Sequence, residues 1–295
     1  MTRTVAKVLA VCMLGCFTTV LPCRGHERFN ADIQAYVLDK FSTNDIVLMG
    51  TTHKQPAILN FMAELVPHLR GAGVTCLALE ISSNQQAHLD RFLATGAAME
   101  NIALHAAIDC PAYRDLLQAL ARLTPGRRPE VIAIDLPEAR YDGPISRDEY
   151  MADRLDKTLR RHPHTKILAM LGSLHVLRKL QWTRPSAERH QAIRTYLARK
   201  RPDLNIFSMV HLPGAAADTC DIARRLKPVP AMVALDVDDC VNSWHLGITA
   251  CLAVRPSRPD ELVDGVILHP DLPLSAAEHL VTGQRAPTSR WVQPF

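Results

Sequence analysis

The feature that most constrains the fold is an alternation of short apolar runs with longer segments of helical periodicity. Five of the runs suit buried strands, at residues 46–49, 74–79, 131–134, 167–171 and 206–210. Strands of a parallel sheet are buried on both faces and read as continuous apolar runs, and the connections between them usually hold a helix. The alternation therefore predicts an α/β fold, with a mainly parallel central sheet and helices on both faces.

The segments between these runs carry helix signals. Four helices are predicted, at 57–69, 85–94, 113–123 and 146–161. The last is the clearest, because Ser146 is a favourable capping residue with Glu149 three positions later. Met151, Leu155 and Leu159 then recur on one face at a helical spacing. These helices lie where a parallel sheet needs its crossover connections.

The carboxyl-terminal third contains three further strand-like runs, at 231–237, 248–254 and 266–268. Connections rich in Pro and Asp separate them. Since no low-complexity tract or long linker divides the chain, we expect residues 27–295 to form a single α/β domain.

The amino terminus has the charge order of a secretory signal. Arg3 and Lys7 precede an apolar run at 8–14, and the first acidic residue is Glu27. This run is shorter than the roughly 20 apolar residues that a membrane-spanning helix needs. We therefore expect residues 1–26 to be an export signal rather than part of the fold.

The processing of this signal has two candidate positions. The stretch Met13-Leu14-Gly15-Cys16 resembles a bacterial lipoprotein cleavage box, which predicts a lipid anchor on Cys16. Cleavage near Gly25 is the alternative and leaves no anchor. The protein is therefore predicted to be exported, either as a periplasmic protein or as a membrane-anchored lipoprotein that meets the membrane only through Cys16.

The charge of the chain argues against a nucleic-acid partner. Of its 34 Lys and Arg residues, three lie in the predicted signal, and the remainder nearly balance 30 Asp and Glu residues. The mature charge is thus close to +1. Such a chain lacks the basic surface that binds phosphate backbones, so a small-molecule or peptide ligand is the expected partner.

The eight cysteines do not make a disulfide framework. Three belong to the predicted signal, and Cys76 lies in a predicted buried strand. The remaining four, Cys110, Cys220, Cys240 and Cys251, lack the CxxC spacing of a structural zinc site. They could pair in an oxidising compartment, with the last three as the first candidates, or stay reduced.

Four of the predicted strands lead into polar residues suited to chemistry. Two of these are histidines, His53 and His175, each in a Gly-x-x-His turn, and two are carboxylates, Glu80 and Asp135. In parallel α/β sheets, ligands bind in the crevice beyond the carboxyl ends of the strands, where residues distant in sequence converge. We therefore expect two imidazoles and two carboxylates to face one pocket at that edge.

Each of these residues also has an ordinary structural interpretation. The histidines can cap the helices that follow them, and Asp135, before Leu-Pro, can shape a turn. Glu80 follows a strongly apolar run, so it must be solvated or paired, and Arg147 is a candidate partner. Arg147 and Arg154 lie seven residues apart on one predicted helix, and either can reach an anion at the strand ends.

His211 and His269 also follow apolar runs and are weaker candidates. Each is close to a proline, in Val210-His211-Leu212-Pro213 and Leu268-His269-Pro270. Edge or turn positions are expected for both.

Four motifs in this part of the chain resemble a known superfamily. They are Gly50-Thr51-Thr52-His53, Ala78-Leu79-Glu80, Arg147-Asp148-Glu149-Tyr150-Met151-Ala152 and Gly172-Ser173-Leu174-His175. Their order and spacing resemble the superfamily of ChaN-like haem-binding lipoproteins, erythromycin-esterase-like enzymes and TIKI/TraB proteins. The resemblance covers about residues 45–177. One departure is Thr51, where many ChaN-like and esterase-like members have Glu, although TIKI/TraB members have Thr.

The resemblance implies an α/β domain whose centre is formed by His53, Glu80, Arg147 and His175. The first function it suggests is a hydrolase that cleaves an ester or amide bond. In one version His53, Glu80 and His175, with Asp135 as a weaker candidate, bind a divalent metal such as zinc, manganese or cobalt. In the other, one histidine is a general base oriented by Glu80, and Arg147 binds an oxyanion or carboxylate.

The alternative function is non-catalytic haem binding, as in ChaN-like lipoproteins. Export, the possible anchor at Cys16 and the neighbourhood of Tyr113 favour it. A structural or interacting domain with an inactive site is a third interpretation.

Overall fold

The computed structural model describes residues 33–178, 191–213, 232–236 and 263–270. The predictions for the signal and for Cys16 lie outside the described residues. So do the predicted strand at 248–254 and Cys220, Cys240 and Cys251. Cys76 and Cys110 lie within them, and both are free thiols.

The centre of the fold is one sheet of seven strands in the order β3-β2-β4-β1-β5-β7-β6. The strands are β1 (Ile46–Thr51), β2 (Val74–Ser82), β3 (Glu130–Asp135), β4 (Lys166–Gly172), β5 (Ile206–Pro213), β6 (Val233–Asp236) and β7 (Gly265–His269). All neighbours pair in parallel except β6, which is antiparallel to β7. The predicted α/β class and mainly parallel sheet are confirmed.

The helices between the strands largely follow the prediction. They are α1 (Ile33–Asp39), α2 (Pro56–Leu69), α3 (Gln86–Thr95), α4 (Pro111–Arg122), α5 (Arg147–Arg161) and α6 (Ile193–Lys200). Short 3-10 helices cover Lys40–Ser42, Arg70–Ala72, Ser83–Gln85, Met99–Asn101 and Glu138–Arg140. The sequence did not predict α1 and α6, which have seven and eight residues. Helices this short show too few turns of periodicity and depend on tertiary packing.

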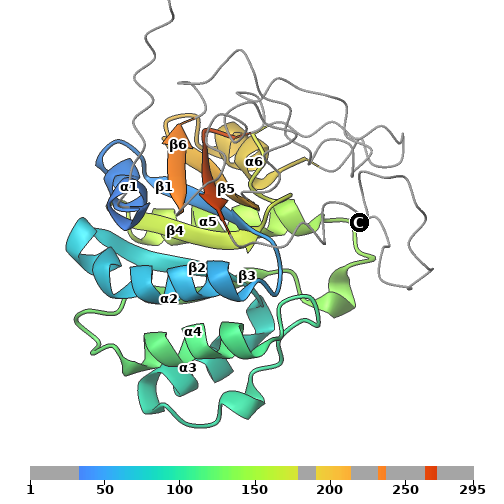
Figure 1. The fold of residues 1–295 in the computed structure, drawn as a ribbon. Coiled ribbons are helices and arrows are strands. Elements are labelled where there is room, and N and C mark those ends of the chain that lie inside the picture. The colour runs from blue at the N-terminus through green and yellow to red at the C-terminus, as the bar shows by residue number, and fades with distance from the viewer. Residues whose placement is uncertain (1–32, 179–190, 214–231, 237–262, 271–295) are drawn as a thin grey trace, which may run out of the picture.

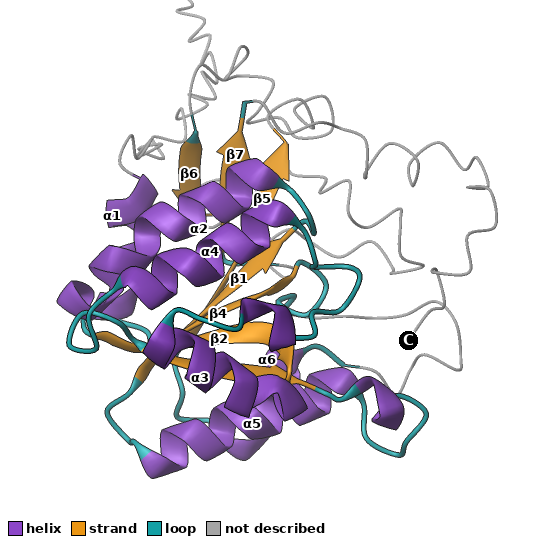
Figure 2. Cartoon of the chain, turned by 90° about the horizontal axis from the view of Figure 1, so that it is seen from below, coloured by secondary structure: helices purple, strands orange, loops and turns teal. Residues whose placement is uncertain are grey.

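The sheet separates two apolar cores. Figures 1 and 2 show the helices that lie on its two faces. Val47 and Met49 of β1 face the core that contains α1, α2, α3 and α4, whereas Ile46 and Leu48 face the core with α5 and α6. This alternation follows from the two-residue repeat of a strand, and it confirms that helices cover both faces. No helix in the described ranges is long and apolar enough to cross a bilayer.

Helix α5 begins at the position that its capping sequence predicts. The Ser146 hydroxyl accepts a hydrogen bond from the Glu149 backbone N–H at 3.1 Å. Ser146 therefore ends the preceding connection and starts the helix at Arg147. The first turn then carries Arg147 and Asp148 beside the carboxyl ends of β2 and β3.

Candidate active site at the carboxyl edge of the sheet

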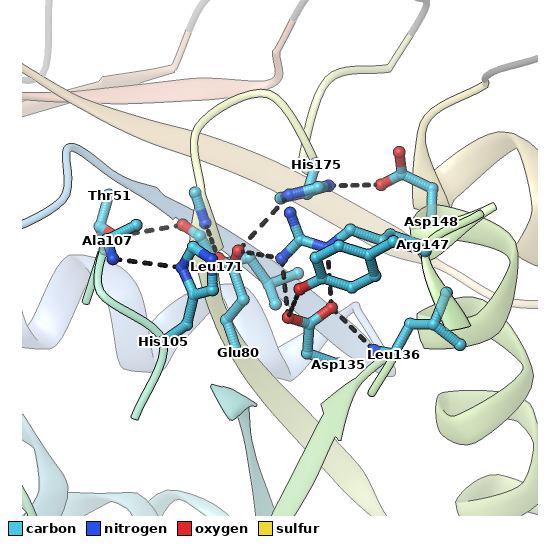
Figure 3. Close-up of polar contacts among 12 residues, drawn as sticks. Thr51, Glu80, His105, Ala107, Asp135, Leu136, Arg147, Asp148, Leu171 and His175 are labelled. Carbon is cyan, nitrogen blue, oxygen red and sulfur yellow. Dashed lines mark hydrogen bonds and ion pairs between the residues drawn. The ribbon is translucent and has the colours of Figure 1, made fainter. Parts of the chain in front are cut away.

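The candidate residues come together because their strands are neighbours. In the order β3-β2-β4-β1, the strand ends bring Asp135, Glu80, His175 and His53 to one edge of the sheet. Figure 3 shows Arg147 between Glu80 and Asp135, with His175 linked to Glu80 and Asp148. The expected gathering of side chains at this edge is present, although none of these contacts fixes what each residue does.

Arg147 is clamped between two carboxylates. Its Nη2 lies 2.8 Å from Oε1 of Glu80 and 2.7 Å from Oδ2 of Asp135, while its Nε donates to Oδ1 of Asp135 at 2.9 Å. The three side chains are between 2% and 10% exposed. A buried guanidinium bonded in this way keeps its charge, and the pKa of Arg147 is raised by the carboxylates against the effect of burial. Arg147 therefore holds Glu80 and Asp135 in place.

Glu80 receives further contacts at both carboxylate oxygens. Its Oε2 accepts a hydrogen bond from the backbone N–H of Gly172 at 2.6 Å, and its Oε1 lies 3.5 Å from Nε2 of His175. Burial works to raise the pKa of Glu80, but the charges of His175, His53 and Arg147 outweigh it and lower the pKa. Glu80 is therefore an ionised carboxylate throughout the physiological range.

His175 is held in its charged form. Its Nδ1 lies 2.6 Å from Oδ1 of Asp148, and its Nε2 faces Glu80. Although burial opposes the charge, Asp148 and Glu80 raise the pKa of His175 to about 10. At neutral pH this buried side chain is an imidazolium that donates from both ring nitrogens.

His53 has the opposite character. It lies in the turn between β1 and α2 and is exposed to solvent at one side. Its Nε2 is 2.9 Å from the position that a β-carbon on Gly172 would occupy, and Oε2 of Glu80 is 3.4 Å from that same point. The packing around the ring lowers the pKa of His53, and Glu80 opposes this effect. His53 is therefore a neutral, accessible imidazole beside a carboxylate.

Three further residues at the site were not assigned a role from the sequence. Asp148 follows Arg147 in the chain, and its carboxylate makes a contact of 2.6 Å with Nδ1 of His175. The Tyr141 hydroxyl donates to Oδ2 of Asp135 at 3.3 Å, and its ring lies 5.2 Å from the Arg147 guanidinium carbon. His105 lies close enough to lower the pKa of His53, and its Nδ1 accepts a hydrogen bond from Ala107 N–H at 3.1 Å.

Adjacency to Arg147 in the first helical turn was the one signal that could have found Asp148. Tyr141 and His105 lie in connections with no motif.

Other candidates have different positions. Arg154 donates to the backbone carbonyl of Ala133 at 3.2 Å, away from the two carboxylates that hold Arg147. His211 lies within β5 and His269 is the last residue of β7, and they contact each other instead of the Glu80 cluster. The expected edge or turn positions are wrong for both, because β5 and β7 are inner strands of the sheet and both side chains are buried. Asp135 bonds Arg147 and also shapes the local turn, because its Oδ1 accepts a hydrogen bond from the Leu136 backbone N–H at 2.8 Å.

The geometry can be compared with the two cofactor hypotheses, a divalent metal ion and haem. Within the described residues, no group of three or more His, Cys, Asp or Glu side chains is arranged to hold a metal ion. Both ring nitrogens of His175 face carboxylates, so this histidine is poorly suited to be a metal ligand. Tyr113, which favoured haem, is buried, and burial raises the pKa of its phenol. It is thus a poor phenolate ligand.

The fold is shared with solved structures of low sequence identity. A mutant of the erythromycin esterase EreC in its open conformation matches with a TM-score of 0.56 and 11% identity, over 81% of this chain and 92% of that chain. A succinoglycan biosynthesis protein matches with a TM-score of 0.53 and 11% identity, over 81% and 91%. The haem-binding ChaN of Campylobacter jejuni has a TM-score of 0.44 and 13% identity, over 60% and 85%.

The first two of these similarities show the fold, an α/β fold as the sequence resemblance implied. The sequence itself matches no family model, and it matches no curated protein. The chain therefore has an α/β fold that it shares with the erythromycin esterase EreC, and a cluster of histidines, acids and an arginine lies at the carboxyl edge of its sheet.

Gly172 provides a direct test of how His53 is placed. In Gly172→Ala, the new methyl group would lie 2.9 Å from His53 Nε2 and 3.0 Å from Cε1, so the ring must swing out of the site. We expect the pKa of His53 to rise towards its ordinary value, because the ring leaves the packed position that lowers it. Histidine titration by NMR measures this change.

Gly126→Ala is the matched control for this substitution. No atom lies within 4 Å of the position of its new methyl group, so the pKa of His53 should not change. An unchanged pKa of His53 in Gly172→Ala would show that the ring does not occupy the described position.

Proposed function

We propose that this chain is a hydrolase that cleaves an ester or amide bond with His53 as its general base. The observation that carries the proposal is that two histidines in one site have opposite protonation states. His53 is neutral and accessible, whereas His175 is held as an imidazolium by Asp148 and Glu80. Pairs of titratable groups whose environments separate their pKa values are typical of acid–base catalysis.

The residues have complementary roles in the proposed reaction. His53 takes a proton from a water molecule as the water oxygen attacks the substrate carbonyl carbon. Glu80, beside the ring, stabilises the imidazolium that then forms on His53. The same His53 returns the proton to the leaving oxygen or nitrogen as the bond to the carbonyl carbon breaks.

His175 and Arg147 support this reaction from the buried side of the site. The distance of 3.5 Å between His175 Nε2 and Glu80 is long for a charged hydrogen bond, so this N–H is available to an oxyanion that develops beside Glu80. Arg147 is a positioning residue, because its donors are directed at Glu80 and Asp135.

The pH dependence tests this assignment. For a substrate found by screening esters and peptides, kcat/KM should rise as His53 loses its proton below pH 6.5 and should fall near pH 10 as His175 does. Asp148→Asn removes the carboxylate that raises the pKa of His175, so the alkaline limb should move to lower pH.

Stability provides a readout that needs no substrate. A pKa of His175 raised from 6.5 to about 10 stabilises the fold fully below pH 6.5, and this contribution is lost as the pH rises towards 10. Asp148→Asn should flatten the fall in the free energy of unfolding over this range. Asp153→Asn, on the same helix and paired with Lys200, is the control. Equal pH profiles for both variants would contradict the assignment of His175.

The metal-dependent and haem-binding alternatives are distinguished by two simple measurements. Turnover that survives dialysis against a chelator supports the metal-free reaction, and loss of turnover with recovery on addition of zinc, manganese or cobalt supports the metal version. A saturable Soret shift on titration with haemin, together with no hydrolysis, would favour the haem-binding function.

We also propose that the protein works outside the cytoplasm. The charge order of residues 1–26 supports export, and Cys16 supports a lipid anchor.

A further inference from the structure

The outer edge of β3 is bonded by two side chains from the helices beside it. Among the described strands, β3 lies at one end of the sheet and has β2 as its one neighbour. At the open edge, Nε2 of Gln86 donates to the Val131 carbonyl at 3.0 Å, and its Oε1 accepts from the Ala133 N–H at 2.7 Å. Arg154 donates to the Ala133 carbonyl at 3.2 Å. Three backbone groups of an edge strand are therefore satisfied by side chains.

The amide of Gln86 makes the bonds of an added strand. In a parallel pair, one residue of the neighbouring strand donates to a carbonyl and accepts from the N–H two residues further on. The Gln86 amide makes the same two bonds, to Val131 and Ala133. Its Nε2 also donates to Oδ1 of Asp90, one turn later on α3, at 2.8 Å. This third bond fixes the orientation of the amide, so Gln86 occupies the place of a strand.

The edge that these side chains close is suited to strand pairing. Residues 131–134 read Val-Ile-Ala-Ile, a run that is mostly β-branched and has no proline. A groove of about 320 Å³ lies along this edge, lined among others by Gln86 of α3 and by Arg154 and Lys157 of α5. An open edge of this kind offers its backbone to another chain. Because a twofold axis brings two copies of one edge together, β3 of a second copy satisfies both edges at once.

We propose that the outer edge of β3 is a surface for pairing with a second copy of this chain, and that Gln86 and Arg154 close it. Removal of the Gln86 amide frees one carbonyl and one N–H of β3, which must then bond to water or to another strand. The proposal concerns the side of the sheet and does not depend on the proposed hydrolysis.

Sedimentation of Gln86→Ala over a range of protein concentrations tests the proposal. Relative to the parent, the dissociation constant for self-association should fall at least about tenfold, since each backbone bond formed between two copies adds to the affinity. Gln86→Ala combined with Arg154→Met should associate more tightly still, because it also frees the Ala133 carbonyl.

Two control variants separate edge opening from the loss of a glutamine. Gln118→Ala, at an exposed position of α4, should sediment as the parent does. Gln86→Glu occupies the same space and places a negative charge beside the edge, which disfavours strand pairing. It should therefore also sediment as the parent does.

Hydrogen exchange covers the case in which Gln86→Ala does not fold. In the parent, the Ala133 N–H should exchange slowly, because it donates to Oε1 of Gln86. In dilute Gln86→Ala this exchange should be faster, and it should slow again as the protein concentration is raised. Folded Gln86→Ala that sediments as the parent does would overturn the proposal. So would fast exchange of the Ala133 N–H in the parent, or equal self-association of Gln86→Ala and Gln118→Ala.

Discussion

Replacement of Arg147 by methionine is expected to lower the free energy of unfolding by about 3–5 kcal/mol, the usual cost of removing one partner from a buried ion pair. Arg147 neutralises Glu80 and Asp135, whose side chains are 7% and 2% exposed. Methionine fills a similar space but leaves two buried carboxylates without their shared cation. Urea denaturation at neutral pH measures the loss.

Two further variants show whether charge is the cause. Arg154→Met, on the same helix, removes a cation that donates to the backbone carbonyl of Ala133, so its cost should be at most about 1–3 kcal/mol. Arg147→Met combined with Asp135→Asn should be less destabilised than Arg147→Met in the parent, because one uncompensated charge is gone. If Arg147→Met costs no more than Arg154→Met, the clamp does not stabilise the site as described.

Replacement of His53 by glutamine is expected to lower kcat/KM by about 10²–10⁴-fold, the usual contribution of a general base. The midpoint of thermal unfolding should hardly change, because His53 is exposed in a turn and its side chain makes no hydrogen bond within the described residues. Steady-state kinetics and a thermal melt on the same preparation separate the two effects.

His88→Gln is the matched control for this variant, since His88 is an exposed histidine on α3. It should retain both activity and stability. Hydrolysis by His53→Gln at the parental rate would exclude His53 as the base, whereas a large drop in its melting temperature would show that its role is structural.

Much of the fold was predictable because local signals and tertiary packing agree. The five apolar runs became β1 to β5, and the run at 266–268 lies in β7. The capping sequence at Ser146 placed the start of α5 to within a residue. In contrast, α1 and α6 are too short to show periodicity, and their apolar residues are recognisable only once the sheet they cover is known.

The sequence by itself determined which polar residues follow the apolar runs of the strands, and thus that His53, Glu80, Asp135 and His175 carry polar groups to one edge of a parallel sheet. The order of the strands in the sheet cannot be derived from the sequence alone, because it depends on how the strands and helices pack together in three dimensions. The order β3-β2-β4-β1 therefore decided that Arg147 bridges Glu80 and Asp135 and that Asp148 reaches His175. The same order set the two histidines in opposite protonation states, since a pKa depends on burial and neighbouring charge, which exist only in the folded chain.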